Sequence, residues 1–200
     1  MMYIKFLLLA ILDITFNVVC YLTNPIVVLF GSEYGNLPWL LTWWDNYDDC
    51  MDVEWFIKEG HVPSCCVYDY DKHYKFYDSN EALQTRGIYK SYVDILDPNF
   101  TLKERLQRYA CRVLWLYRNC AYGFSYYVTG IDIRKADIVE IKTEEKDGYI
   151  YYKTPYAFCY KDERASFGKH HWDNFVGWKF QAVEQDIERC MLAFRITPFQ

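Results

Sequence analysis

The residue types best suited to binding a cation lie together in an acidic segment, residues 45–52. Its oxygen-bearing side chains are Asp45, Asn46, Asp48, Asp49 and Asp52. Clustered oxygens of this kind are typical ligands of Ca²⁺ or Mg²⁺. The spacing differs from that of an EF-hand, because the segment has no central glycine and no glutamate at the twelfth position. We therefore expect a solvated turn here and no metal.

A second candidate is the pair Arg118 and Asn119, which follows a helical pattern and lies among aromatic residues. An arginine beside an asparagine can recognise a phosphate or a carboxylate. The alternative is structural: Arg118 forms an ion pair with the acidic segment, and Asn119 satisfies backbone groups at the helix end. We favour the structural role, with residues 122–124 (Tyr122, Gly123 and Phe124) forming the turn that leads into a sheet.

Histidine and cysteine follow no spacing that completes a zinc site. His61 with Cys65 and Cys66, or His170 with His171, supplies at most part of a four-ligand set. The chain also has no phosphate-binding glycine loop, no G-x-S-x-G and no H-E-x-x-H. The sequence therefore predicts no catalytic residue, no metal and no cofactor.

The eight cysteines include no C-x-x-C pair and show no regular framework. We expect mostly free thiols and a reducing compartment. A disulfide among the cysteines at 50, 65, 66, 120 and 159 stays open as an alternative.

Residues 6–30 are almost wholly apolar, and Asp13 carries the single charge among them. A helix of this length can cross a bilayer core of roughly 30 Å, at a rise of about 1.5 Å per residue. A cleavable signal peptide fits poorly, because only Lys5 precedes the run and no A-x-A-like site follows it. We expect residues 1–32 to be a membrane anchor. The alternative is a helix buried in the core of a soluble domain.

The apolar run carries a narrow polar seam. On a helix, Asp13, Asn17, Cys20 and Asn24 fall within about 60° of one another. An unpaired carboxylate at the bilayer centre costs roughly 2.5–3.5 kcal/mol, so such a seam should face protein. We expect Asp13, Asn17 and Asn24 to bind a partner, either a second copy of the chain or another membrane protein.

Three tryptophans follow the apolar run directly, at Trp39, Trp43 and Trp44. Tryptophan prefers the headgroup zone of a membrane, where its ring is half buried and its N–H stays hydrated. Asn36 can cap a helix and Pro38 suits its first turn. We predict a short helix at the membrane surface within residues 33–52, with an aromatic core helix as the alternative.

The clearest helical pattern covers residues 101–123 and begins with the capping box Thr101-x-x-Glu104. Arg105, Arg108 and Arg112 lie on one face about 60° wide. Beside anionic lipid, each basic residue of this kind contributes about 1 kcal/mol. We expect this face to contact the membrane, and the alternative is a solvated helix face.

The last third of the chain alternates apolar and polar residues. Residues 136–143 and 149–156 flank Asp147-Gly148, a strong tight-turn signal, and residues 175–183 and 191–199 predict two further strands. We therefore predict an α+β fold: an apolar helix, a tryptophan-rich helix, one long amphipathic helix, and an antiparallel β-meander over residues 128–200. Residues 33–200 should form a single domain.

Three motifs stand out along the chain: residues 36–46 (with LPWL and WWDN), residues 112–124 (ending RNCAYGF), and Gly177-Trp178-Lys179 with the closing RITPF. Together they resemble a family of small uncharacterised proteins encoded by tailed bacteriophages and prophages. The acidic turn departs from that family, since Asp48-Asp49-Cys50 stands where a glycine is usual. The resemblance implies a phage origin, so that a host or phage membrane protein becomes a possible partner, and it brings no activity, substrate or catalytic residue.

Composition and charge limit the classes of function that the chain could have. A net charge of −5 gives no electrostatic signal for nucleic acid. We expect a non-enzymatic accessory protein that binds membrane lipid at the host inner membrane. One alternative is a membrane-associated, metal-dependent enzyme acting on phosphate-containing substrates. The other is a cytoplasmic binding module whose N-terminal helix is buried.

Overall fold

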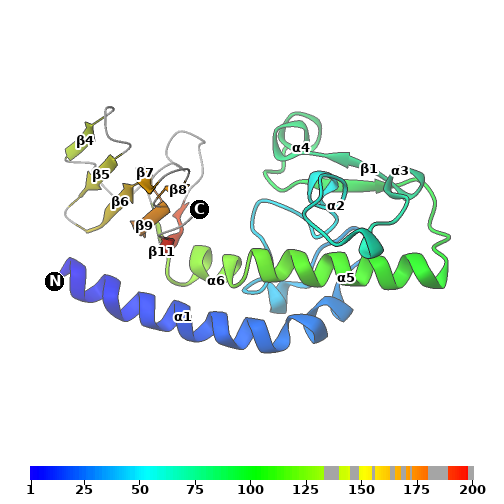
Figure 1. Ribbon diagram of the computed structural model, residues 1–200, viewed down its shortest axis with the longest axis horizontal. Coiled ribbons are helices and arrows are strands. Elements are labelled where there is room, and N and C mark those ends of the chain that lie inside the picture. The colour runs from blue at the N-terminus through cyan, green and yellow to red at the C-terminus, as the bar shows by residue number, and fades with distance from the viewer. Residues whose placement is uncertain are drawn as a thin grey trace. The chain divides into compact units, whose positions relative to one another are not determined.

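The computed structural model describes residues 1–132, 140–144, 149–154, 156–162, 165–167, 170–171, 173–179 and 189–197. These residues form an α+β fold, as the sequence predicts (Figure 1). The chain divides into two compact units. Unit 1 comprises residues 1–15 and 124–200, and unit 2 comprises residues 16–123. This division differs from the boundary expected after residue 32, because the N-terminal helix contributes residues to both units.

The N-terminal helix α1 spans Met2–Val27 and continues as the 3₁₀ turn η1, Val28–Phe30. Pro25 lies near the end of α1 and has no N–H to donate to the Tyr21 carbonyl oxygen four residues earlier. That oxygen accepts a hydrogen bond from the Tyr117 hydroxyl at 3.2 Å instead. The Pro25 carbonyl oxygen accepts a hydrogen bond from the Tyr109 hydroxyl at 2.8 Å.

Unit 2 is built mainly from short helices around a two-stranded antiparallel ribbon. The ribbon pairs β1 (Tyr74–Tyr77) with β2 (Tyr92–Ile95). The shorter helical elements are η2 (Trp39–Leu41), α2 (Glu54–Lys58), η3 (Ser64–Cys66), α3 (Tyr70–His73) and α4 (Ser79–Arg86). The predicted tryptophan-rich helix is thus only a three-residue 3₁₀ turn. Its bonds run from each residue to the third before it, as in Leu41 N–H to the Pro38 carbonyl.

Helix α5, Leu102–Arg118, is the long helix that the capping box predicts. The Thr101 hydroxyl accepts from the Glu104 N–H at 3.3 Å, and the Glu104 carboxylate accepts from the Thr101 N–H at 2.7 Å. The helix ends at Arg118, because Asn119 leaves the helical conformation with a ψ of 40°, and Ala121 then adopts a positive φ of 56°. A second helix, α6, then covers Tyr122–Tyr127, where a turn into the sheet was predicted.

One face of α5 closes the core of unit 2. Trp115 and Leu116 are almost fully buried there, against Phe56 and Ile57 of α2 and Val28 of η1. Close packing of such large side chains fixes the position of α5, and with it the arginines that α5 carries.

Unit 1 contains an antiparallel sheet of five strands in the order β11-β9-β6-β5-β4. The strands are β4 (Glu140–Glu144), β5 (Tyr149–Lys153), β6 (Phe158–Asp162), β9 (Asp173–Trp178) and β11 (Leu192–Thr197). Two short pairs accompany the sheet: β7 (Ala165–Phe167) with β8 (His170–His171), and β3 (Ile131–Asp132) with β10 (Arg189–Cys190). Strands β4 and β5 pair as predicted, while their connecting turn at Asp147-Gly148 lies outside the described residues.

The core of unit 1 forms between the sheet and the start of α1. Phe6 packs edge-on against Phe158 and Trp178, at ring separations of 5.0 and 5.5 Å. Gly177 has a φ of 122°, and a Cβ there would lie 2.1 Å from the Phe158 carbonyl oxygen. Only glycine allows β6 and β9 to approach this closely.

Candidate functional site

The outward face of α1 and η1 is apolar and exposed. In the most apolar 18-residue stretch of this helix, which has a mean hydropathy of 2.0, only 22% is buried. The exposed large apolar side chains are Tyr3, Ile4, Leu7, Leu8, Ile11, Leu12, Ile14, Val18, Val19, Tyr21, Leu22, Ile26, Leu29 and Phe30. By length and composition the helix could cross a membrane, a property that buried core helices and signal sequences share.

Within unit 1, the polar seam of α1 is occupied by the chain itself. Asp13 is 8% exposed, and its carboxylate accepts hydrogen bonds from the Ser125 hydroxyl at 2.6 Å and the Thr129 hydroxyl at 3.2 Å. A buried carboxylate needs such donors to offset its lost hydration. Asp13 therefore faces α6 and the residue Thr129 just beyond it, and its carboxylate is bound by this chain.

Within unit 2, the rest of the seam is only partly covered. Asn24 is 1% exposed, and its side-chain amide has no hydrogen-bond partner among the described residues. The Tyr117 hydroxyl donates to the Tyr21 carbonyl at 3.2 Å. Asn17 is partly exposed, and its 3.5 Å contact with the Cys120 thiol involves the backbone carbonyl oxygen. Asn24 is therefore enclosed by this chain, whereas the side chain of Asn17 keeps some exposure.

The three tryptophans after α1 differ in their surroundings. Trp39 is 79% exposed and Trp43 is 45% exposed. Trp44 is half buried: its ring packs on Phe16 at 4.9 Å and its N–H donates to the Thr23 hydroxyl at 2.8 Å. Trp43 also packs edge-on against Phe16, at 5.8 Å, so Trp43 and Trp44 both fix the segment to α1.

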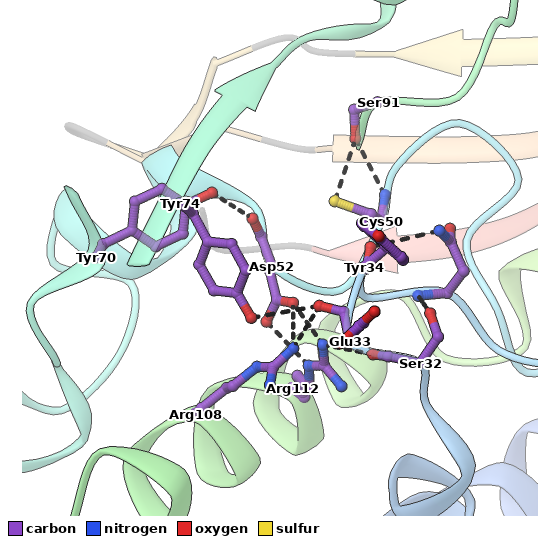
Figure 2. A network of polar contacts seen from close by, with 11 residues as sticks. Ser32, Glu33, Tyr34, Cys50, Asp52, Tyr70, Tyr74, Ser91, Arg108 and Arg112 are labelled. Atoms are coloured by element: carbon purple, nitrogen blue, oxygen red, sulfur yellow. Dashed lines mark hydrogen bonds and ion pairs between the residues drawn. The ribbon is translucent and has the colours of Figure 1, made fainter. Parts of the chain in front are cut away.

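Asp52 is the centre of a buried ion network in unit 2 (Figure 2). The carboxylate is fully buried and accepts hydrogen bonds from both Nε and Nη2 of Arg112, in a bidentate ion pair. Nη2 of Arg108 lies 3.3 Å from the same carboxylate. The two arginines are one helical turn apart on α5, so both reach one partner.

The arginines also bind the chain that leaves η1. Arg112 donates to the Ser32 carbonyl oxygen at 2.9 Å, and Arg108 to the Glu33 carbonyl oxygen at 2.7 Å. The Tyr74 hydroxyl lies 3.4 Å from the same Glu33 oxygen (Figure 2). The network therefore ties the end of the apolar helix to α5 and to the β-ribbon.

Burial alone would raise the pKa of Asp52, but the adjacent Arg112 and Arg108 guanidinium groups hold that pKa below its usual value. Burial would likewise lower the pKa of Arg112, and Asp52 raises it instead. Both groups therefore stay charged over the physiological pH range.

The expected basic face of α5 is divided by this network. Arg112 is 5% exposed and cannot present its charge to a headgroup. Arg108 is largely covered by Asp52 and by the Phe100 ring, 4.9 Å from its guanidinium carbon. Arg105 is exposed, and it has no ion-pair partner within the part of the chain that the structure describes. The membrane role predicted for the trio is thus geometrically open only to Arg105.

A small pocket of about 200 Å³ opens beside the network, within unit 2. Its lining comprises Arg105 and Arg108 of α5, Tyr74 and Ile95 of the ribbon, and Glu33, Pro98 and Phe100 of connecting segments. Sequence reasoning missed this pocket, because its residues are distant in the chain and share no motif.

The acidic segment forms separate internal contacts and not one site. Asp45 is buried and paired with Lys90, and its carboxylate also accepts from the Leu37 N–H at 3.4 Å. Burial raises the pKa of Asp49. Asp48 N–H donates to the Asn46 side-chain oxygen at 3.3 Å. Among the described residues, no group of three or more His, Cys, Asp or Glu side chains could hold a metal ion.

Arg118 does not pair with the acidic segment. Its guanidinium lies over the Trp55 ring at 4.9 Å, and Nη1 is 3.4 Å from Nδ1 of His61. Asn119 donates from its side-chain amide to the Trp115 carbonyl at 3.2 Å, at the end of α5. The acidic segment is instead balanced by Lys90 at one end and Arg112 at the other.

The remaining motif residues serve close packing. A Cβ at Gly123 would lie 1.9 Å from the Thr42 carbonyl oxygen, so glycine is required there. Tyr122 stacks on Tyr47 at 5.4 Å, and Phe124 is 4% exposed.

In unit 1, the Trp178 indole N–H donates to the Thr129 carbonyl at 3.0 Å. The Lys179 ammonium lies 5.7 Å from the Phe175 ring centre. All eight cysteines lie among the described residues, and none forms a disulfide.

A family model matches the whole chain, residues 1–200. The chain belongs to a family of unknown function, DUF7338. No curated protein and no solved structure matches it. The family match includes α1 as well as the sheet of unit 1, and it assigns no activity.

Proposed function

We propose that this protein is a non-enzymatic, membrane-associated accessory protein, held on one leaflet of a bilayer by the outward face of α1. The observation that carries the proposal is the exposed apolar face of this helix, opposite a partly covered polar seam. Monomeric soluble proteins rarely expose a contiguous apolar patch beyond a few hundred Å². Each such side chain that enters the acyl region contributes about 1.5–3 kcal/mol.

The partly covered seam favours a helix that lies in the membrane plane over one that spans the bilayer. Asp13 is hydrogen-bonded to α6, and the carbonyl oxygens of Tyr21 and Pro25 accept from tyrosines of α5. A spanning α1 would have to lose these contacts and place the Asp13 carboxylate in hydrocarbon. An in-plane helix keeps them and still buries its outward face.

Two further features support a location at the membrane surface. Trp39 and Trp43 are exposed beside α1, and tryptophan rings favour the headgroup zone. The resemblance of the three sequence motifs to phage proteins supports a phage origin, which makes the host inner membrane the proposed location.

The rival proposal of a metal-dependent enzyme needs the acidic segment and Arg118 in one pocket. Asp45 pairs with Lys90, and Arg118 lies over Trp55 instead. The described residues therefore give this alternative no support.

Cell fractionation tests the proposal. Membranes from cells that express the protein are washed with carbonate and then with detergent, and retention followed by release is expected. Leu22, which is 75% exposed on α1, is changed to aspartate, and Leu83, 38% exposed on α4, supplies the matched Leu83→Asp control. Leu22→Asp should shift the protein to the soluble fraction while the control stays bound. Equal retention of both variants would refute the role of α1.

A further inference from the structure

We propose that the pocket beside the Asp52 network binds a phosphate group, and that Arg105 is its principal ligand. This inference rests on the proposed function for the source of the phosphate, the headgroup of an anionic phospholipid. The same chemistry could be met by free inorganic phosphate, and the experiment below distinguishes the two.

The charges at the pocket favour an anion. Three guanidinium groups (Arg105, Arg108 and Arg112) accompany two carboxylates (Glu33 and Asp52), so one positive charge is left over. Asp52 is shared by Arg108 and Arg112, which leaves neither arginine fully neutralised. Arginine is the side chain best suited to phosphate, because its planar donors match two phosphate oxygens at once.

The pocket is held in place before any ligand arrives. The Arg108 guanidinium is bound to the Glu33 carbonyl and stacked 4.9 and 5.3 Å from the centres of the Phe100 and Tyr74 rings. Its Nε is buried and has no hydrogen-bond partner among the described residues. Arg105 also lines the pocket, about one turn from Arg108 on α5, and its side chain is exposed.

The size of the pocket suits a small polar group. A volume of about 200 Å³ is below the 300–1,000 Å³ range of typical small-molecule sites. A phosphate with its ester oxygens is therefore a better match than a nucleotide or a larger metabolite.

The position of the pocket connects it to the proposed membrane surface. Leu102 and Leu106, on the first turns of α5, are 75% and 61% exposed. They lie on the same face of α5 as Tyr109, which bonds to the Pro25 carbonyl of α1. Figure 1 shows α5 running alongside the C-terminal half of α1 and extending past its end. The two leucines thus continue the apolar surface, and Arg105 borders it.

A matched control lies on the other side of the same apolar stripe. At 100° per residue, Arg105 and Lys103 lie about 80° to either side of the direction midway between Leu102 and Leu106. Both carry one positive charge and lie about 3 Å apart along the helix axis, but only Arg105 lines the pocket. General attraction to an anionic surface should therefore weaken equally in Arg105→Gln and Lys103→Gln.

The experiment measures binding of purified protein to vesicles of phosphatidylcholine alone and with added phosphatidylglycerol. Wild type should bind the second vesicle more tightly. Lys103→Gln should lose at most about fivefold of this gain, the general effect of one charge near the surface, and Arg105→Gln should lose clearly more. Equal losses in the two variants would overturn the inference and leave the membrane proposal standing. Vesicle binding without a gain from phosphatidylglycerol would do the same if the second arm also shows no binding of inorganic phosphate.

A second arm uses inorganic phosphate alone, titrated at matched ionic strength and followed by calorimetry. Binding by wild type that is lost in Arg105→Gln, together with no binding to either vesicle, supports a free-phosphate site and refutes the membrane proposal. Absence of binding in both arms refutes both proposals. Circular dichroism checks that each variant folds, which the exposure of Arg105 and Lys103 favours.

Discussion

Replacing Asp52 by asparagine should destabilise unit 2 more than any surface charge change of the same kind. The substitution keeps the shape of the side chain and removes its charge. Arg112 would then be left 5% exposed without its counterion, and Arg108 would lose its carboxylate contact. Breaking a buried ion pair from one side costs about 3–5 kcal/mol, because the remaining charge stays desolvated.

The matched control is Asp71→Asn. Asp71 also pairs with a basic residue, Lys58, but its side chain is 73% exposed. An exposed pair of this kind contributes about 0.2–1 kcal/mol. The two substitutions remove the same chemical group, so their difference measures the effect of burial.

Urea unfolding followed by tryptophan fluorescence provides the assay, because unit 2 contains Trp39, Trp43, Trp44, Trp55 and Trp115. With an m value of about 1–3 kcal/mol/M, Asp52→Asn should lower the urea midpoint by about 1 M or more. Asp71→Asn should move it by only a few tenths, on the order of 0.3 M.

A double variant makes the test sharper. Asp52→Leu combined with Arg112→Met replaces both charges by apolar groups, a change that is often nearly neutral in other buried pairs. It should be more stable than Asp52→Asn alone. The reasoning is refuted if Asp52→Asn costs no more than Asp71→Asn, or if the double variant is the less stable of the two.

Three further outcomes follow from the described contacts. Hydrogen bonds from the capping residue Thr101 lower the pKa of Glu104 to about 2, so the stability that its carboxylate contributes is present above its usual pKa of 4.5 and is lost as the pH falls toward 2. In an acid titration followed by circular dichroism, Glu104→Gln should lose stability less steeply than wild type, and parallel curves would contradict this. Gly177→Ala should lower the free energy of unfolding by at least about 2 kcal/mol, because the alanine Cβ would lie 2.1 Å from the Phe158 carbonyl oxygen. Gly60→Ala, where a Cβ meets nothing within 4 Å, should lower it less, and equal melting temperatures for the two variants would count against the close approach of β6 and β9. Asp13→Leu should leave vesicle binding within about twofold of wild type, because the carboxylate faces protein and not lipid; a flotation assay that shows detachment would contradict the orientation of α1.

The local elements of the fold were the most predictable from sequence. The apolar run gave α1, because a long uninterrupted apolar stretch has few other stable structures. The pair Thr101 and Glu104 marked the start of α5, since a capping box satisfies backbone donors within four residues. Both signals are contained in a short window of sequence.

The short tryptophan segment shows where local signals mislead. Pro38 and an apolar run favoured a helix, but only a 3₁₀ turn forms. Trp44 contacts α1 through a hydrogen bond to Thr23 and ring packing on Phe16, and Gly123 packs against the Thr42 carbonyl. These contacts join residues far apart in the chain, and propensity gives no account of them.

The site depended on pairings that sequence spacing could not specify. Asp52 and Arg112 are 60 residues apart, and nothing in the acidic segment distinguishes Asp52 from Asp45 as the partner of an arginine. The spacing of Arg108 and Arg112 indicated a shared face, but not that this face would be half buried. Which side of α1 the protein covers could be inferred from the seam; that its own α6 covers Asp13 could not.

The orientation of the membrane-bound chain tests the central claim most directly. Epitope tags placed before Met1 and after Gln200 are exposed to protease in sealed inner-membrane vesicles that carry the protein. A helix lying in one leaflet predicts that both tags are cleaved from the same side of the membrane. Protection of the N-terminal tag together with cleavage of the C-terminal tag would show that α1 spans the bilayer, and would contradict the account.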